Sequence, residues 1–138
     1  DYDPSIPTII ADAEQLIQAV LNLVRNAMQS LTSPDIEHNL GRIIIRSRII
    51  RNSTIDSKFH RLAASIGIID NGPGIPEDLI NTIFYPMISG RAEGTGLGLS
   101  ITHGIINQHE GMIECQSDQA ETKFTILLPL EPTAAKSA

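Results

Sequence analysis

Two asparagines four positions apart, Asn22 and Asn26, have the residue type and spacing to bind a metal ion or a phosphate. On a helix this spacing places both side chains on one face, and each side chain offers a neutral carbonyl oxygen and an amide donor. Mg²⁺ takes oxygen ligands and draws several of them from phosphates and water, so an amide carbonyl can complete its set. Solvated asparagines explain the pair equally well in isolation. Asparagine is nevertheless a poor helix former, and two of them in an apolar helix call for a reason.

The loop Asp70-Asn71-Gly72-Pro73-Gly74 follows an apolar run and offers a carboxylate and two glycines. An ordinary turn is the first explanation for these residue types. The functional alternative is a carboxylate that faces a bound base. Because a carboxylate only accepts hydrogen bonds, it suits an exocyclic amino group such as that of adenine, and glycines let a flat ligand approach the backbone.

A third segment, Gly-Thr-Gly-Leu-Gly-Leu at 94–99, places glycines at alternate positions before an expected helix. Glycines leave the backbone N–H groups unobstructed, and the N-terminus of a helix attracts anions. The spacing differs from the Gly-x-Gly-x-x-Gly dinucleotide motif, and the chain lacks the Gly-Lys-Ser/Thr of a P-loop. The segment therefore indicates an anion site without defining its ligand.

The elements that must position these residues follow from hydrophobic periodicity. Apolar residues at three- and four-residue steps predict a helix over 12–31 with Asp12 as its N-cap. Helices and strands in mixed order predict an α+β fold, a two-layer α/β sandwich in which about three helices cover one face of a mixed, mostly antiparallel sheet. The other expected elements are strands over 41–51 and 58–70 joined by a polar connection at 52–57, a short helix from 76 to 82–84, a loop over 84–94, a helix ending near 111, and strands over 112–117 and 123–130.

Composition limits the functional classes. The chain has 138 residues, of which 41% are hydrophobic, so it fits one domain with a true core, expected over 1–130 with a flexible tail at 131–138. Its 16 acidic and 10 basic residues give a net charge of −6, which argues against nucleic acid as the main partner. The apolar runs are far shorter than the ~20 residues of a membrane helix. The single cysteine, Cys115, excludes an internal disulfide framework, and we expect no signal peptide at the start of the chain.

The order and separation of the three motifs carry more information than any one of them. Asn-x-x-x-Asn on a helix, Asp-x-Gly-x-Gly after a strand, Phe84 before a loop, and the glycine-rich helix start together resemble the ATP-binding catalytic domain of sensor histidine kinases. That domain belongs to the superfamily that includes gyrase, the Hsp90 chaperone and the MutL repair protein, and the resemblance implies its Bergerat-type ATP-binding fold. The segments at 23–31 and 84–91 more narrowly resemble the NtrB family of nitrogen-regulation sensor kinases.

The resemblance implies a role for each matching position. It implies that Asn26 ligates an Mg²⁺ ion bridging the ATP phosphates and that Asn22 lies one turn earlier beside them, these two being the catalytic residues. It also implies that Asp70 holds the adenine amino group and that Thr122 closes the adenine pocket. Arg91 either reaches a phosphate or is solvated. The remaining implied residues are Gly72, Gly74 and Ile75 around the base, Phe84 at the start of an aromatic box, Ser89 and Arg91 in an ATP lid that ends at Gly94, and Gly94, Thr95, Gly96, Leu97, Gly98 and Leu99 in the phosphate loop.

Three positions depart from the usual kinase pattern. Gln29 stands where a lysine is common, which puts one phosphate or ribose contact in doubt. Met87 replaces the second phenylalanine of the aromatic box, and we expect looser packing of the lid because methionine is an adaptable filler. Ala120 replaces a glycine. Several members of the NtrB family share the first two departures.

The residue at position 22 separates two classes of enzyme. Hydrolysing members of the superfamily carry a glutamate there as a general base. An amide cannot accept a proton at neutral pH, so Asn22 implies phosphoryl transfer to a protein histidine, which needs mainly positioning and charge neutralisation. The chain's own histidines lack the acceptor context of the family, and we interpret all of them as structural or solvated. They are His38, His60, His103 and His109.

The partners implied by this assignment are the histidine-bearing dimerisation domain of the same kinase, an NtrC-like response regulator and a PII signalling protein. We expect no direct contact with nucleic acid or membrane, a cytoplasmic location, a monomeric isolated domain and a dimeric full-length kinase. Two alternatives stay open. One is a nucleotide-binding regulatory module that docks a PII-type regulator without transferring phosphate, and the more distant one is a fragment of a hydrolytic chaperone or topoisomerase.

Overall fold

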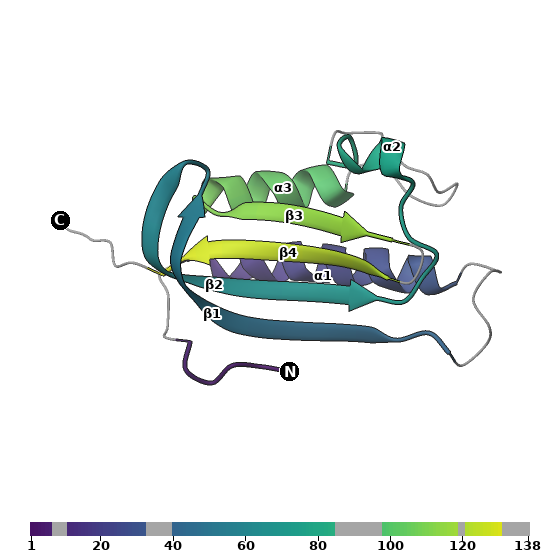
Figure 1. Cartoon of the computed structure of the whole chain (residues 1–138), viewed down its shortest axis with the longest axis horizontal. Helices are drawn as coiled ribbons and strands as arrows, with labels where there is room; N and C mark the ends of the chain where they lie inside the picture. The colour runs from purple at the N-terminus through teal and green to yellow at the C-terminus, as the bar shows by residue number, and fades with distance from the viewer. Residues whose placement is uncertain (7–10, 33–39, 85–97, 119–120, 131–138) are drawn as a thin grey trace.

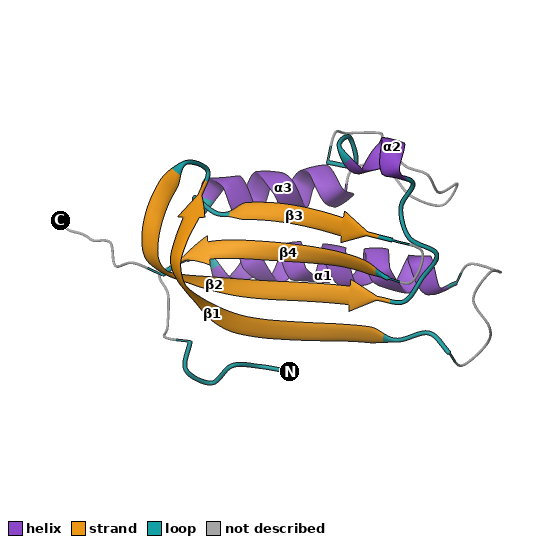
Figure 2. Ribbon diagram, in the orientation of Figure 1, coloured by secondary structure: helices purple, strands orange, loops and turns teal. Residues whose placement is uncertain are grey.

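The computed structural model describes residues 1–6, 11–32, 40–84, 98–118 and 121–130. Within them, helices cover one face of a four-stranded sheet whose strand order is β1-β2-β4-β3 (Figures 1 and 2). This arrangement confirms the predicted α+β sandwich. The elements are α1 (Ala13–Leu31), β1 (Ile43–Ile55), β2 (Lys58–Asp70), α2 (Glu77–Ile80), α3 (Gly98–Gln108), β3 (Met112–Ser117) and β4 (Thr122–Pro129).

Helix α1 begins and ends close to the predicted residues. Asp12 has extended backbone geometry, and its carboxylate accepts a hydrogen bond from the Gln15 N–H at 3.1 Å, which makes it the predicted N-cap. Leu23 and Ala27 are fully buried on the side that faces the sheet. Helix α3 packs beside α1 on the same face (Figure 1). The two helices therefore bring residues distant in sequence into contact.

The connection predicted over 52–57 is wrong, because the hairpin is longer. Strand β1 continues to Ile55, and only Asp56 and Ser57 form the turn. Both turn residues have positive φ, 48° and 70°, as the two-residue turn that matches strand twist requires. Ile55 is 1% exposed and packs in a small second cluster with Ala63 and Leu127. Because Ile55 is buried at the end of β1, the polar residues that precede it at 52–54 stay in the strand.

Asp1 and Asp3 lie along the outer edge of β1. The Asp1 nitrogen donates to the Ile45 carbonyl at 3.1 Å and the Asp1 carbonyl accepts from the Ser47 N–H at 2.9 Å, which is the pattern of a parallel ladder. At Asp3 the contact with β1 continues through side chains. The Asp3 N–H donates to Ser47 Oγ at 2.9 Å, and the Asp3 carboxylate accepts from the Ile49 N–H at 3.1 Å. The four strands of the described residues pair antiparallel throughout, which confirms the antiparallel part of the predicted sheet. The parallel contact of Asp1 lies outside any strand.

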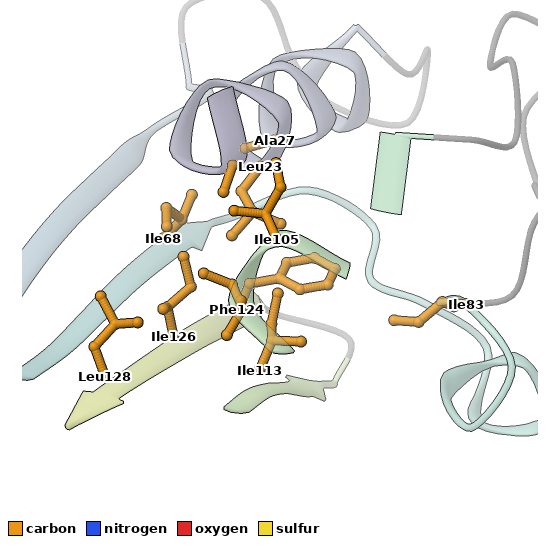
Figure 3. Packing of buried hydrophobic residues seen from close by; sticks show 11 residues of the cluster. Leu23, Ala27, Ile68, Ile83, Ile105, Ile113, Phe124, Ile126 and Leu128 are labelled. Carbon is orange, nitrogen blue, oxygen red and sulfur yellow. The ribbon is translucent and has the colours of Figure 1, made fainter. Parts of the chain in front are cut away.

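The main core lies between the helices and the sheet, and it is built chiefly from aliphatic side chains. Figure 3 shows Leu23 and Ala27 of α1 above Ile68, Phe124 and Ile126 of the two central strands. Ile83, just after α2, is also buried in this cluster. Because α1 and the central strands share this core, the packing fixes where the polar side of α1 lies relative to the strand ends.

We expect Leu23→Ala to destabilise the chain by about 3–5 kcal/mol, because the lost methyl groups leave a cavity in a core that cannot fully collapse. Leu23 is 0% exposed, whereas Leu21 on the same helix is 48% exposed. Denaturant unfolding measures both changes. Leu21→Ala is the matched control and should change the free energy of unfolding by less than about 1 kcal/mol. Equal losses for the two variants would contradict this packing.

Candidate functional site

A polar stripe on α1 runs along the candidate site. Asn22, Asn26 and Ser30 follow one another at four-residue steps and so share one side of the helix. At one end of the stripe, Asn22 Nδ2 donates to the Gly98 carbonyl, at 3.5 Å, where α3 begins. At the other end, Ser30 is buried and touches the loop after β2, since a Cβ placed on Gly72 would overlap Ser30 Oγ. Asn26 therefore lies between the start of α3 and the Gly72 loop.

Asp70 is a buried carboxylate at the end of β2. It is 2% exposed, and its Oδ1 accepts a hydrogen bond from the Gly72 N–H at 2.9 Å. The register between β2 and β4 pairs Asp70 with Thr122 and, two residues back, Ile68 with Phe124. Side chains two residues apart on a strand lie on one face, and Ile68 and Phe124 belong to the core under the helices. Asp70 and Thr122 therefore lie together on the helix-facing side, as the predicted base site requires.

Ser117 holds the loop after Asp70 against the end of the sheet. Its Oγ accepts a hydrogen bond from the Ile75 N–H at 2.8 Å and lies 2.9 Å from the Thr122 hydroxyl. Gly74 has a φ of 88°, and a Cβ there would overlap the Asp118 carbonyl oxygen. The predicted Gly74 and Ile75 therefore belong to the same region as Asp70 and Thr122. Ser117 was not predicted from the sequence, because its contacts arise from strand register and loop packing and no sequence spacing marks them.

An aromatic group lies next to this region. Phe84 stacks on the His103 ring of α3 with the ring centroids 5.5 Å apart, and it meets Phe124 of β4 edge-on at 6.1 Å. The structure thus places Phe84 in an aromatic cluster with His103 and Phe124. Its role in the aromatic box stays a prediction, because Met87 lies outside the described residues. His109 is structural, as expected: its Nε2 accepts from the Asp12 N–H at 3.1 Å and its Nδ1 lies 2.9 Å from the Ile105 carbonyl.

The described part of the glycine-rich segment is the start of α3. Gly98 is the first residue of that helix, and its carbonyl accepts from both Asn22 and the Thr102 hydroxyl. Leu99 packs against the main core. The other predicted residues of the lid and the phosphate loop lie outside the described residues, and their roles stay predictions. They are Ser89, Arg91, Gly94, Thr95, Gly96 and Leu97.

The described residues contain no group of three or more histidine, cysteine, aspartate or glutamate side chains that could hold a metal ion. The predicted ligand, Asn26, offers one neutral amide oxygen. Such a position suits Mg²⁺ when the ion takes its other ligands from phosphates and water. The residues present therefore fit a metal that enters together with a phosphate ligand, and they do not form a metal site by themselves.

We expect the Cys115 thiol to resist alkylation in the folded chain. Burial, and to a smaller degree the Asp70 carboxylate, raises the pKa of this thiol from 9.0 to about 12. Because the thiolate is the nucleophile, labelling by iodoacetamide at pH 8 should be about 100-fold or more slower in the folded chain than in denaturant. Between pH 9 and 12 the unfolded thiol loses its proton first, so the stability contributed by this group falls as pH rises. Equal labelling rates in the folded and denatured chain would contradict the burial.

The architecture and the site together define a class of protein. The family model of "Histidine kinase-, DNA gyrase B-, and HSP90-like ATPase" matches residues 11–132 of the chain. The chain therefore belongs to this family of ATPase domains, as the motifs predicted.

Individual relatives narrow this assignment to sensor histidine kinases. The chain is 52% identical over 130 residues to "Sensory histidine kinase/phosphatase NtrB" of Vibrio alginolyticus and 48% identical over 130 residues to the protein of that name from Escherichia coli O157:H7. Each match covers 94% of this chain and 36% of the relative, so the chain spans about a third of their length. A solved catalytic domain of histidine kinase ThkA has a TM-score of 0.73 and 28% identity, covering 94% of this chain and 75% of that one. The predicted likeness to the NtrB family is confirmed.

None of the helices in the described residues is long and apolar enough to cross a lipid bilayer.

Proposed function

We propose that the chain is the ATP-binding catalytic domain of an NtrB-like sensor histidine kinase, transferring the γ-phosphoryl group of ATP to a histidine on a separate dimerisation domain. The observation that carries the proposal is the stripe Asn22-Asn26-Ser30, which extends from the start of α3 to the loop beside Asp70. One helix face thus connects a candidate anion site with a candidate base site. A nucleotide is a ligand with both parts.

At the base end, the buried Asp70 carboxylate supplies the acceptor for the adenine amino group. Its Oδ1 already accepts from the Gly72 N–H, and a carboxylate has room for several such bonds. The loop glycines keep the backbone clear of side chains next to it. Gly72 has no space for a Cβ against Ser30, and Gly74 needs its positive φ. These contacts support a rigid base site.

At the phosphate end, the start of α3 and the two asparagines carry the chemistry. Backbone N–H groups at a helix N-terminus attract anions, and the Asn22 side chain is already fixed against Gly98. Asn26 would hold Mg²⁺, and the bound ion would neutralise charge on the phosphates. Phosphoryl transfer needs little more than such positioning and charge neutralisation.

The neutral side chain of Asn22 favours transfer over hydrolysis. An amide cannot remove a proton from water at neutral pH, so the chain places no general base at this position. We infer negligible ATP hydrolysis by the chain alone. We infer that the phosphoryl group reaches a histidine outside this domain. Among the described residues, His103 and His109 are engaged in packing and hydrogen bonds.

The partners, location and oligomeric state of the kinase follow from the same assignment. We infer that the phosphorylated histidine passes its group to an NtrC-like response regulator, that a PII signalling protein controls the kinase, and that it acts in the cytoplasm. We also infer that the isolated domain is monomeric and that the full-length kinase is dimeric. The support for these inferences is the identity with NtrB proteins over nearly the whole chain.

The direct test of this function is phosphotransfer to a separately supplied dimerisation domain. The chain, γ-labelled ATP, Mg²⁺ and an NtrB-type dimerisation domain should together give acid-labile label on the acceptor domain. An acceptor whose histidine is replaced by alanine is the control and should stay unlabelled. Tight ATP binding without any transfer would overturn the proposal and favour a regulatory module that docks its partner without chemistry.

A further inference from the structure

A pair of hydroxyl groups, on Ser117 and Thr122, lies at the end of the sheet. Ser117 is the last residue of β3 and Thr122 is the first residue of β4, and the strand register places them opposite each other. Thr122 is 3% exposed and also lies opposite Asp70 on its other side. A seryl hydroxyl, a threonyl hydroxyl and a carboxylate therefore occupy neighbouring places across three strands.

The direction of one hydrogen bond in this group is fixed by its donor, and it favours one direction for the next. The Ile75 N–H can only donate, so Ser117 Oγ accepts from it at 2.8 Å. A seryl hydroxyl has one proton and two acceptor positions. With one acceptor position already used, the proton of Ser117 is available for Thr122 Oγ1 at 2.9 Å. A chain of bonds that all point one way is strengthened by mutual polarisation.

When Ser117 donates to Thr122, the proton of Thr122 must point elsewhere. Thr122 then acts as a hydrogen-bond donor beside the Asp70 carboxylate, which acts as an acceptor. Adenine offers the complementary pair, because its exocyclic amino group donates and the ring nitrogens on either side of it accept. An acceptor and a donor placed side by side therefore match this edge of the base.

We propose that Ser117 is a positioning residue that makes Thr122 a hydrogen-bond donor to a ring nitrogen flanking the adenine amino group. The inference rests on the proposed function, since it assumes that the base binds beside Asp70. Ser117 itself touches the loop and Thr122 and not the base. Its effect on binding should therefore depend on the presence of the ring nitrogen.

The test is a binding titration with ATP, 1-deaza-ATP and 7-deaza-ATP, each of the two analogues lacking one flanking ring nitrogen. Wild type should bind one analogue about 3- to 10-fold more weakly than ATP, the range of one hydrogen bond. Ser117→Ala should bind ATP weaker by a similar factor and should no longer distinguish that analogue from ATP. Ser117→Thr keeps the hydroxyl and should restore the discrimination.

Gln116 is the matched control, because it precedes Ser117 on the same strand and its side chain is exposed. Gln116→Ala should behave as wild type with all three nucleotides. Two results would overturn the inference: wild type that binds both analogues as well as ATP, or Ser117→Ala that loses the same factor for all three nucleotides, as a purely structural role requires. The proposed function fails separately, when wild type binds no ATP at all.

Discussion

Asp70→Asn should weaken ATP binding by about 10- to 100-fold, the range expected for losing a hydrogen bond to a charged group. Asparagine keeps one acceptor oxygen but replaces the other by an amino group. The amide NH₂ of asparagine would then face the amino group of adenine. Two hydrogen-bond donors would meet where the wild-type protein pairs a donor with an acceptor. Asp70 is 2% exposed, so water cannot readily compensate.

A displacement titration with a fluorescent ATP analogue measures this change. Asp78 of α2 provides the control, since it is an exposed carboxylate in the same chain, and Asp78→Asn should leave the affinity unchanged. Because Asp70 is buried, the unfolding free energy of its variant has to be recorded as well. A folded Asp70→Asn variant that binds ATP as tightly as wild type would contradict the base site.

Asn26→Ala should reduce phosphotransfer by about 100-fold or more and should remove most of the dependence of ATP binding on Mg²⁺. The substitution deletes the one amide oxygen that we assign to the metal. Asn26→Asp restores an oxygen ligand, so it should recover Mg²⁺-dependent binding. The measurement is ATP affinity and transfer rate over a series of Mg²⁺ concentrations.

The control for Asn26 is Gln18, an exposed residue two turns earlier on the same helix. Gln18→Ala should retain both the transfer rate and the Mg²⁺ dependence of wild type. An Asn26→Ala variant whose ATP affinity still rises with Mg²⁺ as in wild type would show that the metal is held by other residues.

The layers of the fold were predictable because local signals agreed with the packing. The apolar periodicity of α1 and its Asp12 cap predicted the first and last residues of that helix closely. The hairpin connection was not predictable in the same way. Polar residues at 52–55 indicated a loop, but the tight Asp56-Ser57 turn and the burial of Ile55 keep them in the strand. Tertiary packing thus overrode local polarity.

The candidate site was predictable where it depends on spacing. Asn22 and Asn26 share a helix face, and the same four-residue step leads on to Ser30, which the sequence could have revealed. Ser117 and His103 could not be found in this way, because their contacts join segments distant along the chain. The domain limits of 1–130 and the tail at 131–138 stay predictions.

Magnesium-dependent ATP binding by this chain is tested by a calorimetric titration of ATP, performed once with Mg²⁺ and once with a chelator. We predict one saturable site per chain whose affinity for ATP falls clearly when Mg²⁺ is removed. Absence of saturable binding, or an affinity that is the same with and without Mg²⁺, would contradict it.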